Sequence, residues 1–148
     1  MLINKDNLKL LGDNYEAHQH VFDEFMDKIG HLFIDVPSLY IEFLPEEIQL
    51  KYLGKLFSLR HKYSIEEKAG YLIVYYADRI DDCEVFEAVE KYQFKKQGNA
   101  RLANSGDAGY PWNMRSFTED FFYQLIDNLI EFTVEKERAS FSRMWQKL

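Results

Sequence analysis

The sequence predicts a mainly α-helical protein, a compact single-domain bundle of about five or six helices. Two long stretches repeat apolar residues at helical spacing, and helix-starting motifs precede several of the predicted helices. The starts, apolar faces and ends of these helices agree with one another, as they do in sequences that specify one fold. With 148 residues, the chain fits a single domain, residues 1–148.

The first predicted helix covers residues 13–33. Asp13 and Glu16 have the spacing of a capping box, in which a side chain at the helix start accepts a hydrogen bond from a backbone amide. The apolar positions that follow alternate spacings of four and three and form one stripe: Leu11, Tyr15, His18, Phe22, Phe25, Ile29 and Leu32. We therefore expect this helix to pack along one face.

Two helices are predicted next, over residues 45–62 and 64–80. Pro45 stands where the first turn of a helix tolerates proline, and Ser64 with Glu67 forms a further capping box. Apolar residues follow at helical spacing in both segments. The pattern therefore favours helices in this part of the chain.

Some segments fit strands nearly as well. Residues 35–45 are compatible with a strand or a helical turn, and residues 71–76 are rich in β-branched and aromatic residues. The segment 82–97 favours a helix that closes before a glycine. The alternative fold class is α+β, in which a small antiparallel sheet is packed by the N- and C-terminal helices. Its strands would be residues 38–44, 56–63 and 70–78.

The last predicted helix, residues 116–137, is the best candidate for the core of the fold. Ser116 and Glu119 form a capping box at its start. Its apolar positions cover more than half of the circumference: Phe117, Phe121, Phe122, Leu125, Ile126, Leu129, Ile130, Phe132, Thr133 and Val134. Such a helix is expected to be packed on two sides.

Composition and charge limit the classes of function. The net charge is −7 and the pI is about 5.1, which argues against nonspecific nucleic-acid binding. No apolar run reaches the length of a membrane span, and the N-terminal residues do not resemble a signal peptide. Cys83 is the single cysteine, so disulfides and cysteine-based zinc sites are not expected. We expect a cytoplasmic protein that contacts neither membrane nor nucleic acid.

The segment 98–115, which we interpret as a long loop, is one candidate binding site. It contains three glycines and a proline, and it carries residue types that are frequent in binding hot spots. These are Arg101, Tyr110, Trp112 and Arg115, the last of which directly precedes the start of a helix. The competing interpretation is that Trp112 folds back to cover the core.

The polar face of the first helix is a second candidate site. Its carboxylates include Glu16, Asp23, Glu24 and Asp27, and they could dock a basic protein surface. His20 and His31 interleave with them at metal-ligand spacing. This stripe points away from the apolar one, however, whereas a metal site in a bundle faces inward. We therefore expect neither a metal nor a cofactor.

These patterns favour a small acidic interaction protein without catalytic activity, with an inhibitor, immunity-type or adaptor role towards a protein partner. No nucleotide-binding, hydrolase or kinase motif occurs in the sequence. The alternative hypothesis is a small-ligand-binding protein or enzyme with its site under the 98–115 loop. A third hypothesis is a homo-oligomer that associates through leftover apolar surface of the last helix.

Overall fold

The chain folds as a curled antiparallel sheet with one helix before it and one after it. The computed structural model describes residues 4–32, 34–80, 83–105 and 109–146, without the side chains of 79–80 and 141–146. The described elements are α1 (Lys5–His31), β1 (Leu39–Leu44), β2 (Glu47–Tyr52), β3 (Lys55–Ser64), β4 (Ala69–Ile80), β5 (Cys83–Phe94), β6 (Asn99–Leu102), β7 (Trp112–Asn113) and α2 (Thr118–Gln146).

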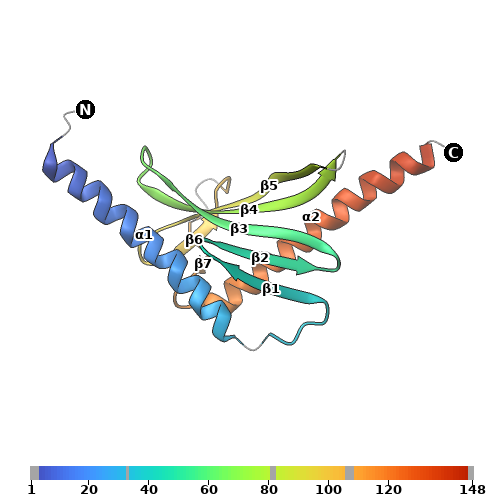
Figure 1. Cartoon of the computed structure of the whole chain (residues 1–148), viewed down its shortest axis with the longest axis horizontal. Coiled ribbons are helices and arrows are strands. Elements are labelled where there is room, and N and C mark those ends of the chain that lie inside the picture. Colours follow the sequence, from blue (N-terminus) through green and yellow to red (C-terminus); the bar gives the residue numbers. More distant parts are fainter. Residues whose placement is uncertain (1–3, 33, 81–82, 106–108, 147–148) are drawn as a thin grey trace.

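The seven strands follow one another in space in the order in which they occur in the chain. Each pairs antiparallel with the next, so the sheet is a meander with β1 and β7 at its edges. The two helices form a V in Figure 1: α1 ends near the start of α2, and their outer ends diverge. Aromatic contacts from both helices reach the same, inner face of the sheet, as between Phe22 and His61 and between Phe121 and Tyr92.

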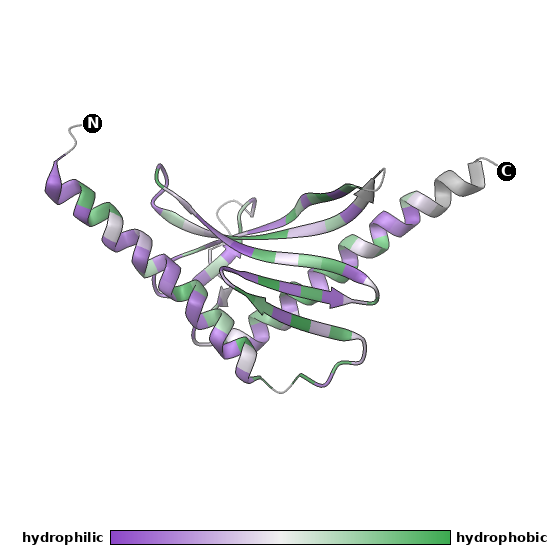
Figure 2. Ribbon diagram, viewed as in Figure 1, coloured by the Kyte–Doolittle hydropathy of each residue, from purple (hydrophilic) through white to green (hydrophobic). Residues whose placement is uncertain are grey.

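The core lies between the inner face of the sheet and the two helices. Hydrophilic and hydrophobic residues alternate along the strands, as expected when one sheet face is buried (Figure 2). The buried strand residues include Ile48, Leu50, Phe57, Leu59, Leu72, Val74, Tyr92 and Phe94. The helices meet them with Val21, Phe22, Phe25, Phe121, Phe122 and Leu125. Strands β2 to β5 therefore each contribute alternate residues to one core.

Gly70 permits the closest approach within this core. A Cβ atom at this position would lie 2.5 Å from the Phe94 ring and 3.0 Å from the His18 ring. Any larger residue would therefore displace the Phe94 ring. Gly70 begins the apolar segment of β4 and lets α1 lie directly on the sheet at His18.

The prediction of a mainly α-helical bundle of five or six helices is wrong. The segments 45–62, 64–80 and 82–97 are not helices but strands and tight turns, within the described residues of each. The ranges 38–44, 56–63 and 70–78 lie in β1, β3 and β4, but the sheet is not small, because it has seven strands. The structure is mostly β, so the description of the protein as helical is corrected.

Turn residues explain why the helix interpretation failed. Leu53 and Gly54 both have positive φ angles, 52° and 78°, and this combination closes a two-residue hairpin between β2 and β3. Ser64 does accept a hydrogen bond from the Glu67 amide, at 3.1 Å, but in the turn between β3 and β4. A capping-box spacing is also compatible with such a turn, since both place an amide near a serine oxygen.

The two observed helices are longer than predicted. Helix α1 begins after Asn4, whose side chain accepts a hydrogen bond from the Asn7 amide at 2.8 Å. Asp13 and Glu16 therefore lie inside the helix and do not cap it. Before α2, the Asn113 side chain accepts the amides of Arg115 and Ser116, both at 2.9 Å.

Candidate functional site

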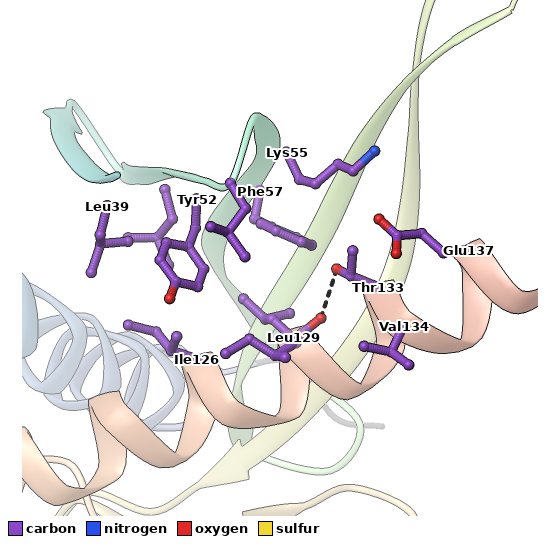
Figure 3. A pocket seen from close by; sticks show the side chains of 12 residues that line it. Leu39, Tyr52, Lys55, Phe57, Ile126, Leu129, Thr133, Val134 and Glu137 are labelled. Atoms are coloured by element: carbon purple, nitrogen blue, oxygen red, sulfur yellow. Dashed lines mark hydrogen bonds between the residues drawn. The ribbon is translucent and has the colours of Figure 1, made fainter. Parts of the chain in front are cut away.

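An apolar groove opens between the inner face of the sheet and α2. Strands β1 to β3 form one wall with Leu39, Leu50, Tyr52 and Phe57, and Leu53 continues it from the adjoining turn. Helix α2 forms the other wall with Ile126, Leu129, Ile130 and Val134. Figure 3 shows these two sets of side chains facing each other across the opening. We call this surface the α2 groove.

The α2 groove has an apolar interior and a polar mouth. Its cavity volume is about 100 Å³. Three polar side chains lie at the mouth of the groove: Lys55, Thr133 and Glu137. Lys55 comes from β3 and Glu137 from α2, on opposite sides of the opening (Figure 3). The Thr133 hydroxyl donates a hydrogen bond to the Leu129 carbonyl oxygen at 2.8 Å. That hydroxyl is thus satisfied within the helix. Apart from the Tyr52 hydroxyl, which points into the groove (Figure 3), the interior offers dispersion contacts.

Apolar side chains around the groove remain open to solvent. Leu53 is 61% exposed and Val134 is 38% exposed. Such side chains at the rim of a cavity are typical of an interaction site, because a partner gains free energy by covering them. Thus the α2 groove is a concave, mainly apolar surface that is suited to binding an apolar group.

The structure brings two of the predicted loop residues together. The Tyr110 ring lies 4.6 Å from the Arg101 guanidinium carbon and 4.4 Å from the Lys95 ammonium nitrogen, measured to the ring centroid. Arg101 also donates hydrogen bonds to the Gln93 side chain at 3.0 and 3.2 Å. The 98–115 segment is not one loop, since it contains β6 and β7.

Trp112 and Arg115 have contacts within the fold. The Trp112 ring packs against Tyr92 and Phe121, with centroid distances of 5.8 and 5.9 Å, so it covers the core. The Arg115 guanidinium lies 2.6 Å from a Glu24 carboxylate oxygen, and this hydrogen bond lowers the pKa of Glu24. The pair joins α1 to the segment that precedes α2.

The acidic face of α1 is only partly available for a partner. Glu24 is paired with Arg115, and Asp23 accepts a hydrogen bond from Gln19 at 3.0 Å. Glu16 and Asp27 are exposed, and Asp27 lies 3.7 Å from His31. Within the described residues, no three metal-ligating side chains of histidine, cysteine or carboxylate type converge.

The residues of the α2 groove were missed as a site by the sequence analysis. The signal was present in two places: the alternation of Ile48, Leu50 and Tyr52, which fits a strand, and the wide apolar arc of residues 116–137. The arc is too wide for one packed face, and its surplus lines the groove. Without the curl of the sheet, however, the sequence does not show which apolar positions remain uncovered.

Comparison of the chain with protein-family models, with characterised proteins and with solved structures found no match. In the described residues, neither helix combines the length and the apolar character that crossing a membrane requires. Any proposal of function therefore depends on the geometry of this chain.

Proposed function

We propose that this chain is a non-catalytic binding protein whose protein partner inserts an apolar side chain into the α2 groove. The observation that carries the proposal is the open apolar cavity between β1–β3 and α2, rimmed by exposed Leu53 and Val134. Burying apolar surface contributes roughly 25 cal/mol per Å², so a single inserted side chain would contribute substantially to binding.

The size of the groove favours a side chain over a whole small molecule. Its volume of about 100 Å³ is below the roughly 300–1,000 Å³ of typical ligand pockets. An apolar cavity of about 150 Å³ holds one benzene molecule. The α2 groove therefore fits one aliphatic side chain, such as leucine or isoleucine, better than a cofactor or a drug-sized ligand.

The partner of this proposal also carries a basic residue beside its apolar side chain, which would pair with Glu137 at the mouth of the groove. Lys55 lines the mouth opposite Glu137, whereas the exposed Glu131 and Glu135 lie on the face of α2 that points away from the groove. Exposed carboxylates of this kind increase association rates with positively charged surfaces.

A reducing cytoplasmic setting is part of the proposal, because the one cysteine, Cys83, is free and exposed.

Photo-crosslinking in the native cell tests this function. The photoreactive residue benzoylphenylalanine would replace Val134 at the groove, or Ile65 at the β3–β4 turn as a matched exposed control. We expect a discrete protein adduct from position 134 and none from position 65. The adduct should disappear when Thr133→Trp fills the groove. Equal adduct patterns from both positions, or an adduct that survives Thr133→Trp, would refute the proposal.

A further inference from the structure

The outer face of the sheet has a composition of its own. Both helices pack on the inner face, and no described helix covers the outer one. Tyr110, between β6 and β7, lies over the outer face at Lys95 and Arg101. The strand register places two neighbouring rows of side chains there. One row contains Lys62, Tyr71, Gln93 and Arg101, and the other contains Arg60, Ile73 and Lys91.

The part of this face formed by the two rows on β3 to β6 is basic in a chain that is acidic overall, whereas Glu42 on β1 and Glu84 at the other end of β5 lie outside these rows. The cations of these two rows and of the adjoining end of β5 are Arg60, Lys62, Lys91, Lys95 and Arg101. On the neighbouring strand, Glu47 accepts hydrogen bonds from Ser58 and from Arg60. That carboxylate offsets the charge of Arg60, so Lys62, Lys91, Lys95 and Arg101 carry the excess positive charge. Total charge, on which the expectation against nucleic acid is based, does not describe this local excess of positive charge.

Aromatic rings interleave with the cations. The Lys91 ammonium lies 4.7 Å from the centroid of the Tyr71 ring, and the Lys62 ammonium lies 5.8 Å from that of Tyr75. The Arg60 guanidinium lies 5.1 Å from both the Tyr75 and the Phe86 rings. These contacts place the cations beside rings, in an arrangement that extends from β3 to β5.

We propose that the outer face of the sheet binds single-stranded nucleic acid. The ammonium groups of Lys62, Lys91 and Lys95 would contact phosphates, and Tyr71 and Tyr75 would contact bases. Residues two apart on a strand are separated by about 6.8 Å, a spacing that lets cations and rings alternate along an extended chain. Sheet faces that bind single strands combine these two residue types, because every base has a π-face and every linkage a charge. An acidic protein partner could pair with the cations of this face, but it would gain little binding free energy from the tyrosine rings.

Fluorescence anisotropy with a labelled oligouridylate of about 12 nucleotides, at about 50 mM salt, tests the proposal. We expect the triple variant Lys62→Gln/Lys91→Gln/Lys95→Gln to weaken binding at least about tenfold and to lower the salt slope by about two. The control variant Lys5→Gln/Lys9→Gln/Arg138→Gln changes the net charge equally at exposed helix positions and should bind within about twofold of wild type.

A second pair of measurements separates nucleic acid from any other polyanion. Tyr71→Leu/Tyr75→Leu should weaken oligouridylate binding about fivefold or more and leave inorganic polyphosphate binding unchanged. Absence of wild-type binding to the oligonucleotide, or an equal loss in the control variant, would overturn the proposal. Equal effects of the tyrosine substitutions on both ligands would overturn it as well, in favour of a surface that reads charge alone. Circular dichroism of each variant confirms that the sheet is intact.

Discussion

His61 shows how a single half-buried residue connects packing to pH. Its Nδ1 lies 2.8 Å from the Gln19 side-chain oxygen, while its buried Nε2 has no hydrogen-bond partner among the described residues. The ring packs against Phe22 and Phe94, with centroid distances of 5.8 and 5.3 Å. Burial, with a smaller contribution from His18, lowers the pKa of His61 from 6.5 to about 4. The imidazole is therefore neutral in the folded protein at neutral pH.

This shift predicts acid sensitivity of the fold. Between pH 6.5 and about 4 the unfolded chain binds a proton at His61 that the folded chain does not, so stability falls as the pH falls through this window. Wild type should lose free energy of unfolding over this pH range, and we expect His61→Phe to remove about 2 kcal/mol of that loss. The figure allows for the partial solvent access of His61. Urea unfolding at several pH values measures it. His20→Gln, at an exposed position, should keep the wild-type slope; an unchanged slope in His61→Phe would contradict this account.

At the scale of elements, the sequence predicted the two long helices, and it indicated a sheet between them only as an alternative with three of the seven strands. The apolar stripe from His18 to Ile29 is buried as its spacing indicates. The strands are hard to recognise in the sequence because their outer face also carries apolar residues, such as Leu56 and Ile73. Together with the apolar residues of the inner face, these form apolar runs that also fit one face of a helix. Only pairing across the sheet distinguishes the two interpretations, and pairing is not local in sequence.

The β2–β3 hairpin offers a test of this explanation. Leu53 adopts a positive φ angle that asparagine tolerates much better than leucine does. Leu53→Asn should therefore raise the free energy of unfolding by about 0.5 kcal/mol. Leu53→Val, which is β-branched, should lower it by about 1 kcal/mol. Urea titration reads out both. A helix through residues 45–62 would predict the reverse order, since asparagine is no better than valine in a helix interior and breaks the apolar stripe.

At the scale of the whole molecule, the curl of the sheet creates the candidate site. Part of the inner face packs on α1 and α2, but α2 diverges from the sheet near β1–β3 and leaves the α2 groove uncovered (Figures 1 and 3). The sequence analysis identified α2 as the most apolar helix. The site predicted before the start of that helix lies outside this groove and stays a prediction. The groove could not be located from the sequence, because the position of an uncovered surface depends on how the sheet curves.

The most direct test of the central claim is methyl NMR during titration with N-acetyl-leucinamide, the smallest mimic of an inserted leucine. The account predicts saturable shifts at the methyl groups of Leu50, Ile126 and Ile130, with none at Ile65 on the distant turn. It also predicts that Thr133→Trp abolishes them. Shifts that rise linearly without saturation, or that persist in Thr133→Trp, would contradict the assignment of the α2 groove as the site that receives an apolar side chain.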